Sequence, residues 1–396
     1  MSSIGHPTSR EILGPFNNIT YIRYRGQFRG ETGNNEEYSV PYEITVPQTV
    51  NEGEQLFVFE PPHLTSGLVA RDTLLGERFL FERGYSHASC GFGNRARHIL
   101  DPNPPFNLKI RGNPIRVIPP DSTETEVVDY RIVRQFVAEL RRSVSPLFGP
   151  VRHVIGVGFS DSGRTIHEMY PSFGHKSFDL TFAGTADYVA PIRVEDQRPI
   201  MVVNTEADFD ARAIPNPAFP AYRYYDLTGA PHIPDAKLTR GVFNGKTLPG
   251  IAGTTPINWL PFARALFKAG DAWIRNGKQP PPSATFQLGP NGEILRDDRQ
   301  NALGGIRHPA LQLREARFIA SLDRNGWDLF GDYRDPRQLT AAEFPEYVRS
   351  FKRATDALFD AGYLLDRGRD RLHRQCQLKP NNTFTLNYRD GLVVRS

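Results

Sequence analysis

Ser160 is the residue of this chain whose surroundings best suit a nucleophile. Residues 152–157 read as an apolar strand, Gly-Phe-Ser-Asp-Ser-Gly occupies positions 158–163, and residues 164–170 can open a helix. A strand that turns sharply into a helix exposes the hydroxyl of a serine at its tip. Such a turn accepts only small side chains two positions before and after the serine, and Gly158 and Ser162 meet this requirement. We therefore expect Ser160 to be a nucleophile.

A second, looser pattern places Ser86 between Gly84 and Ala88. The residues that follow, 89–94, read Ser-Cys-Gly-Phe-Gly-Asn and do not open a helix. A strained strand-to-helix turn needs a strand before the serine and a helix after it. The context therefore favours Ser160 over Ser86.

An acid is expected beyond the strand predicted at residues 199–204. Asp208 lies four residues after the end of this strand and 48 residues after the serine, and we prefer it. Glu206 competes for the same role, because it follows the same strand. Asp187, after the strand predicted at 178–183, is a more distant alternative.

A histidine follows the last strand of the predicted sheet. His232 lies on the loop after residues 222–227, and it comes after both the serine and the acid. Serine, acid and histidine follow one another in this order in α/β-hydrolases, each beyond the carboxyl end of a strand. A serine hydroxyl needs a base that accepts its proton, and an acid fixes the tautomer of the imidazole. His232 is therefore the predicted base.

Backbone amides must stabilise the negative charge that develops on the attacked carbonyl oxygen. One donor is expected from Asp161, directly after the nucleophile. The second should come from the loop after the strand predicted at 55–60, where two prolines lack an N–H group. His63 or Leu64, the first residues after those prolines, is therefore the expected donor.

The elements that must position these residues alternate between strands and helices. Such alternation predicts a mostly parallel central sheet with helices on both faces, an α/β fold. Apolar residues recur at helical spacing between 126 and 142, directly before the strand that carries the serine, and again between 262 and 273. The predicted strands lie at 21–26, 38–45, 55–60, 152–157, 178–183, 199–204 and 222–227.

Residues 1–282 are interpreted as the hydrolase core, and residues 283–396 as a C-terminal extension of the same domain. In the extension, Thr340 and Glu343 form a capping box before a helix that Gly362 is placed to end. Only 48 residues separate nucleophile and acid, which leaves little room for an inserted cap. We therefore expect residues 283–340 and the proline-rich loop 101–121 to roof the active site as a lid.

Two further side chains are candidates for substrate contact. Trp259 would wall the acyl pocket, or it would belong to the core. Arg307 follows a Gly-Gly pair and would contact substrate or the roof, with a surface loop arginine as the alternative.

Composition excludes several other classes of protein. The 396 residues are 39% hydrophobic, and no run approaches the roughly 18 apolar residues of a membrane span. The formal net charge is +4, but arginines and acids alternate without a basic block, so nucleic-acid binding is not expected. The two cysteines form neither a disulfide framework nor a metal-ligand spacing. The first residues lack a secretory signal pattern, so we expect a cytoplasmic protein without metal or cofactor.

With these segments assigned, the chain from about residue 55 onward resembles a family of α/β-hydrolase-domain proteins from bacteria and fungi. The resemblance implies the α/β-hydrolase fold and a triad of Ser160, an acid from the 206–208 pair, and His232. In one place the chain departs from the family, because Pro61-Pro62-His63 stands where relatives carry an Asn-Arg-Gly turn. The matching stretches are Gly-Phe-Ser-Asp-Ser-Gly-Arg (158–164), Asn-Thr-Glu-Ala-Asp (204–208), Leu-Thr-Gly-Ala-Pro-His (227–232), residues 272–283, residues 301–309, and Ala-Gly-Tyr-Leu-Leu (361–365).

The leading hypothesis from the sequence is a serine hydrolase that cleaves a small-molecule carboxylic ester through an acyl-serine intermediate. Two alternatives stay open. One is a catalytically silent α/β-hydrolase fold that binds a small hydrophobic ligand, and the other is an acyltransferase that uses the same triad.

Overall fold

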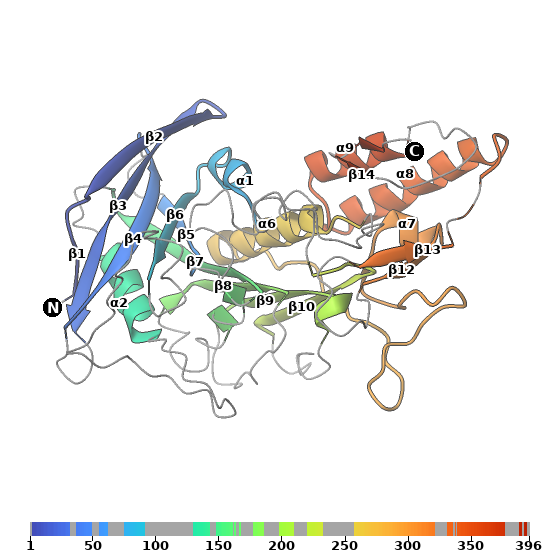
Figure 1. Ribbon diagram of the computed structural model, residues 1–396, viewed down its shortest axis with the longest axis horizontal. Coiled ribbons are helices and arrows are strands. Elements are labelled where there is room, and N and C mark those ends of the chain that lie inside the picture. The colour runs from blue at the N-terminus through green and yellow to red at the C-terminus, as the bar shows by residue number, and fades with distance from the viewer. Residues whose placement is uncertain are drawn as a thin grey trace, which may run out of the picture. The chain divides into compact units, whose positions relative to one another are not determined.

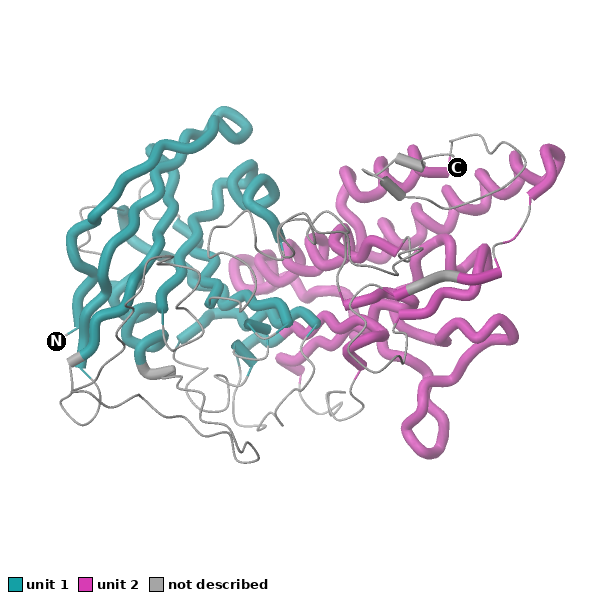
Figure 2. The backbone as a smooth tube through the Cα atoms, viewed as in Figure 1, with its two compact units in different colours: residues 1–200 teal, residues 201–396 magenta. Residues whose placement is uncertain are grey.

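A computed structural model describes most of the chain in two compact units, residues 1–200 and residues 201–396 (Figure 2). Each unit is described separately below. The described residues are 2–31, 37–49, 55–61, 75–91, 130–142, 148–160, 162–163, 166–167, 177–185, 198–209, 220–232, 257–320, 331–335, 337, 339–376, 388–389 and 392–393.

The first unit is built on a mixed sheet whose strands follow the order β1-β3-β4-β6-β5-β7-β8, with β2 also paired to β3. The strands at the N-terminal end, up to the β4–β6 pair, run antiparallel. From β6 through β5 and β7 to β8 every pair is parallel. The strands are β1 (Ser3–Ile4), β2 (Ser9–Phe16), β3 (Ile19–Glu31), β4 (Glu37–Pro47), β5 (Gln55–Phe59), β6 (Ser86–Cys90), β7 (Val151–Phe159) and β8 (Leu180–Gly184).

Helices cover both faces of this sheet. Phe28 of β3 packs edge-on against Phe136 of α2 (Tyr130–Arg141), while Tyr21 of the same strand stacks on Phe81 of α1 (Glu77–Phe81). Residues separated by an odd number along a strand point to opposite faces. The predicted arrangement of helices on two faces is therefore confirmed in this unit (Figure 1).

The second unit carries the strands β9-β10-β11 side by side, and β10 and β11 pair in parallel. β11 lies in the segment interpreted as the C-terminal extension, so the sheet continues beyond residue 282. The boundary at 282 itself stays a prediction. The strands are β9 (Ile200–Thr205), β10 (Tyr222–Thr228) and β11 (Ile306–Arg307), and β9 leads into a short 3-10 turn, η4 (Glu206–Asp208).

Two helices of the second unit, α6 and α8, lie where the sequence predicts them. Directly after α6 comes Gly277, whose left-handed φ of 68° ends the helix. Thr340 and Glu343 exchange the bonds of a capping box directly before α8, and Gly362, with φ 82°, follows the end of α8. The elements are α6 (Leu260–Asn276), α7 (Pro309–Gln312), β12 (Arg317–Ile319), β13 (Asp332–Arg334), α8 (Phe344–Asp360), α9 (Asp366–Gln375), β14 (Tyr388–Arg389) and β15 (Leu392–Val393).

Between α6 and β11 the chain forms a folded loop, residues 284–305, which we call the arm. Its segments are held by backbone bonds such as Gln287 N–H to Leu303 O and Leu295 N–H to Gln287 O. At its base, Ala284 pairs with Tyr225 of β10. Figure 1 shows the arm in gold and orange, extending away from the strands of its unit.

Candidate active site

Ser160 lies directly after β7 with a φ of 55°, in the left-handed region that residues other than glycine rarely adopt. Its amide donates to Gly184 O at 2.9 Å and to Thr185 Oγ1 at 3.2 Å, at the end of the neighbouring strand β8. Strain of this kind persists only where the surroundings hold it, and it gathers at functional sites. The backbone at Ser160 therefore has the strained turn of a nucleophile elbow.

Gly158 shows why this turn needs small residues. A Cβ atom built on Gly158 would lie 2.1 Å from the carbonyl oxygen of Ser162. The Ser162 side chain takes part in the turn as well, because its Oγ accepts from the Phe159 amide and donates to the Phe159 carbonyl, both at 2.8 Å. The second serine thus closes the turn with its own side chain, where the stricter pattern has glycine.

Ser86, the rival serine, is the first residue of β6 and is 1% exposed. The strand continues from Ser86 to Cys90, so no helix follows this serine directly, in keeping with the sequence-based preference for Ser160. The adjacent His87 and the more distant His167 are fully buried, and burial lowers the pKa of each to about 3. Both imidazoles are therefore neutral at physiological pH.

The second unit brings Asp208 and His232 together. Asp208 Oδ1 lies 2.6 Å from Nδ1 of His232, and the two side chains are 1% and 5% exposed. The other carboxylate oxygen of Asp208 accepts from the Thr205 hydroxyl. A carboxylate bound to Nδ1 holds the imidazole in the tautomer whose lone pair lies on Nε2. This pair therefore has the geometry of the acid and base of a triad.

Glu206, the alternative acid, makes different contacts. One of its oxygens accepts from the Gly229 amide at 2.8 Å, and the other binds the Arg296 guanidinium at 2.7 Å. The structure thus pairs His232 with Asp208, and it pairs Glu206 with the backbone of the loop that leads to His232. The role of either residue as triad acid stays a prediction.

Trp259 lies just before α6 and has no exposed surface. Its indole N–H donates to Pro231 O at 3.0 Å, directly before His232. In this position Trp259 fixes the loop of the predicted base. The expectation that it walls an acyl pocket stays a prediction.

The sequence analysis missed a buried series of hydrogen bonds next to Asp208. Asn204 Nδ2 donates to Asp208 O and to the Tyr224 hydroxyl, each at 3.3 Å, and the Tyr224 hydroxyl bonds in turn to Asp226. Asp226 accepts from Phe286 N–H at 2.8 Å. Burial raises the pKa of Asp226 to about 7, and the nearby Glu206 charge also raises it. A carboxylate inside the tyrosine-rich strand 222–227 was the sequence signal for these hydrogen bonds.

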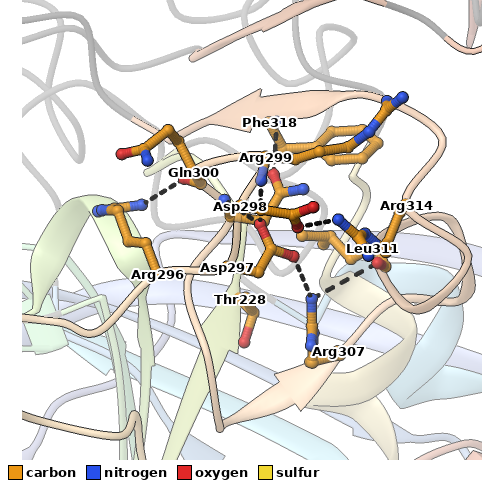
Figure 3. A network of polar contacts seen from close by, with 12 residues as sticks. Thr228, Arg296, Asp297, Asp298, Arg299, Gln300, Arg307, Leu311, Arg314 and Phe318 are labelled. Carbon is orange, nitrogen blue, oxygen red and sulfur yellow. Dashed lines mark hydrogen bonds and ion pairs between the residues drawn. The ribbon is translucent and has the colours of Figure 1, made fainter.

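Arg307 lies in β11, inside a polar network at the base of the arm (Figure 3). Its guanidinium is 3.5 Å from both Asp297 Oδ2 and Leu311 O, and its side chain is 24% exposed. Asp297 also accepts from the amides of Arg299 and Asn301. Arg307 therefore links the arm to α7, and its contact with a substrate or a roof stays a prediction.

Several predicted positions lie outside the described residues. They include both oxyanion positions, Asp161 and His63, with Leu64 as the alternative donor. They also include the distant acid candidate Asp187 and the loop 101–121 expected to contribute to a lid. The roles expected of these residues therefore stay predictions.

Within the described parts of the chain, no helix is both long and apolar enough to cross a bilayer. Across the same residues, no group of three or more His, Cys, Asp or Glu side chains is arranged to hold a metal ion. Cys90 and Cys376 are free thiols, and both are buried.

Comparison with known protein families identifies one clear match. The model of a family described as an alpha/beta hydrolase domain matches residues 108–374, which is 267 of the 396 residues. The matched range includes Ser160, Asp208 and His232. A search of curated proteins found no match.

Solved structures with similar coordinates include three hydrolases. A ferulic acid esterase from Streptomyces cinnamoneus is 13% identical, with a TM-score of 0.37 over 65% of this chain and 90% of its own. A siderophore hydrolase, EstB, from Aspergillus nidulans is 14% identical, with a TM-score of 0.32 over 56% and 93%. An S-formylglutathione hydrolase from Agrobacterium tumefaciens is 11% identical, with a TM-score of 0.34 over 56% and 91%. The family assignment rests on the family model alone.

Proposed function

The chain belongs to the family of alpha/beta hydrolase domain proteins, and we propose that it is a serine hydrolase that cleaves a small-molecule carboxylic ester. The reaction would proceed through an acyl-serine intermediate, with Ser160 as nucleophile, His232 as base and Asp208 as acid. The cytoplasm stays the expected compartment on the sequence evidence. Membership in the family supports a hydrolase, and the proposed roles of individual residues rest on the contacts described below.

The observation that carries this proposal is the contact of 2.6 Å between Asp208 Oδ1 and His232 Nδ1. With Nδ1 as donor, the neutral ring carries its lone pair on Nε2, which is the atom that a general base must offer to a serine hydroxyl. Both side chains are almost fully buried, and an electrostatic interaction is stronger there than in water. The strained backbone at Ser160 supports the choice of nucleophile independently.

In the proposed first half of the reaction, Ser160 Oγ attacks the ester carbon while His232 Nε2 takes the hydroxyl proton. The bond between carbon and the alkoxy oxygen then breaks, and His232 returns the proton to the leaving alcohol. In the second half, water attacks the acyl-serine in the same way and releases the acid and free Ser160. The amides of Asp161 and His63 are proposed to stabilise the oxyanion of both steps.

A fluorophosphonate probe tests the nucleophile. We expect the folded wild-type chain to be labelled and Ser160→Ala to be unlabelled, because the probe reacts only with an activated serine. Ser86→Ala is the matched control, since it removes the rival serine from β6, and it should label like the wild type.

Two other outcomes would replace the proposal. Absence of labelling in a folded wild-type protein would favour a silent fold that binds a hydrophobic ligand. Labelling together with transfer of the acyl group to added alcohols in preference to water would identify an acyltransferase. A panel of model esters of increasing acyl length then measures the substrate preference.

A further inference from the structure

Glu206 uses its two carboxylate oxygens to hold two different segments of the second unit. Oε2 accepts from the Gly229 amide, on the loop after β10, and Oε1 binds the guanidinium of Arg296, in the arm. The same guanidinium nitrogen of Arg296, Nη1, also donates to Gln300 O at 3.1 Å, which ties the side chain to the arm. A single side chain therefore connects η4, the loop that leads to His232, and the arm.

The Glu206 carboxylate is more deeply buried than the guanidinium that binds it. The Glu206 side chain is 5% exposed, while that of Arg296 is 36% exposed. A buried carboxylate must be paired, because leaving one partner alone costs more than the pair contributes. Since Arg296 is the cation that binds Glu206, the arm supplies the charge that keeps the carboxylate in place.

Gly229 is the point where the carboxylate holds the loop. Its φ is 68°, and a Cβ atom there would lie 2.8 Å from Leu311 Cδ1, so the backbone is committed to a tight turn three residues before His232. The two carboxylates of η4 thus hold the same loop at two points. Asp208 binds the imidazole of His232, and Glu206 binds the backbone that carries it.

We propose that Glu206 is a positioning residue: held by Arg296, its carboxylate fixes the Gly229 amide and thereby sets the position of the His232 imidazole. This inference rests on the proposed function, because it assigns His232 the role of base. It also gives the arm a part in the reaction that does not require contact with substrate. Misplacement of a reacting group by about 1 Å can cost roughly 100-fold in rate.

Two variants of Glu206 separate the roles of charge and hydrogen bond. Glu206→Gln keeps an oxygen that accepts from Gly229, and we expect its kcat to stay within about 3-fold of the wild type. Glu206→Ala removes the acceptor, and we expect kcat to fall about 10-fold to 100-fold while KM moves less than about 3-fold. A merely structural residue would not divide its effect between kcat and KM in this way.

Arg296→Met tests the counter-ion. It leaves an unpaired negative charge beside the loop, and a nearby negative charge raises the pKa of an imidazole. The acid limb of kcat/KM should therefore move to higher pH, and the double variant Glu206→Gln/Arg296→Met should return it. Arg299→Met is the matched control on the same arm, since Arg299 reaches Asp335 O, and it should behave like the wild type.

Among the residues that the structure describes, Arg296 binds Glu206, Asp226 senses its charge, and Asp208 of the Asp208–His232 pair lies on the same short turn. The imidazole of His232 can be titrated directly by NMR in the full chain, with His232→Gln as the assignment control. This measurement does not depend on turnover. If the wild type is inert toward fluorophosphonate and esters, the proposed function fails, whereas the titration of His232 still tests the positioning role.

Two results would overturn the inference. One is a folded Glu206→Ala protein with the kcat and His232 pKa of the wild type. The other is a Glu206→Gln protein that loses about 1000-fold or more in kcat, because Glu206 would then be the triad acid itself. Should Glu206→Ala fail to fold, the Arg296→Met variant and its double variant still decide, since an unchanged acid limb and kcat in Arg296→Met contradict the role.

Discussion

The turn at Ser160 and the loop at His232 are held in place by different means. At Ser160 the backbone contributes most, through a left-handed φ, a glycine with no room for a Cβ and the bond from the Ser160 amide to Gly184 O, while the hydroxyls of Ser162 and Thr185 add short-range bonds within the turn. At His232 side chains do it, since Asp208 holds the ring, Trp259 holds the preceding carbonyl, and Glu206 holds the turn.

This difference predicts how each region responds to change. Backbone geometry is shared by every atom of a turn, so a substitution there disturbs the turn as a whole. A side-chain hydrogen bond can be removed by itself, and the effect stays local and graded. A single substitution in the Ser160 turn should therefore cause a large loss of activity and stability. Single substitutions around the His232 loop should cause smaller, graded losses.

Gly158→Ala is expected to have the largest effect. Its Cβ would lie 2.1 Å from Ser162 O, which is backbone and cannot move aside without opening the turn. We expect loss of fluorophosphonate labelling and a fall of more than about 3 kcal/mol in the free energy of unfolding, measured by denaturant titration. The matched control is Gly149→Ala, where nothing lies within 4 Å of the new methyl group. If both variants kept the labelling and stability of the wild type, the backbone at Gly158 would not be what holds the Ser160 turn.

Asp208→Asn should come next, with a loss confined to chemistry. An asparagine amide can donate to Nδ1 and so hold the wrong tautomer, which leaves Nε2 protonated and unable to act as base. We expect kcat to fall about 10⁴-fold with an almost unchanged thermal midpoint. Steady-state kinetics with a model ester and a melting curve check both statements, and a kcat within 10-fold of the wild type would falsify the assignment of the acid.

The pH dependence of stability should separate the two units. Burial raises the pKa of Asp226 to about 7 from its ordinary value of 3.8, so the folded second unit holds a proton that the unfolded chain has lost between those values. The contribution of Asp226 to the free energy of unfolding is therefore full below about pH 4. It falls as the pH rises through 7, by as much as about 4 kcal/mol. In the first unit, the lowered pKa of His87 and His167, about 3, has the opposite sign. Stability there is present above about pH 6.5 and is lost as the pH falls toward 3.

Hydrogen exchange followed by mass spectrometry can measure the units separately. We expect peptides from β10 to be less protected at pH 8 than at pH 5 after correction for intrinsic exchange, and peptides from β6 to show the reverse below pH 5. Asp226→Asn should flatten the dependence in β10 and leave β6 unchanged. Identical profiles for β10 in variant and wild type would argue against a buried, proton-holding Asp226.

Trp259→Phe should have the smallest effect of the four. A smaller aromatic ring replaces the buried indole, so the N–H bond to Pro231 O is lost and a small cavity is left; we expect a loss of about 2 kcal/mol in stability and a few-fold decrease in kcat. Trp273→Phe, on the adjoining helix, is the control and should keep the wild-type kcat. A Trp259 variant with altered KM and unaltered kcat would instead favour contact with the substrate.

Much of the fold could be predicted from local patterns. The strands β3, β4, β5, β7, β8, β9 and β10 and the helices α2, α6 and α8 lie where apolar periodicity and capping signals put them. β6 was missed, because Ser-His-Ala-Ser-Cys has no apolar run. Its strand conformation comes from pairing with β4 and β5 on either side, which no local pattern records. β11 was missed for the same reason, since two residues become a strand only beside β10.

The sequence alone determined which residue types stand at which strand ends, because a nucleophile turn, an acid and a histidine in this order leave a local mark on the chain. It left Asp208 and Glu206 as competitors, since both follow the same predicted strand within four positions. Only the tertiary structure decided which carboxylate faces the imidazole and which one meets Gly229 and Arg296. The reason is physical: these partners lie between 23 and 90 residues away along the chain, and the contacts exist only after the strands, the loop and the arm have packed.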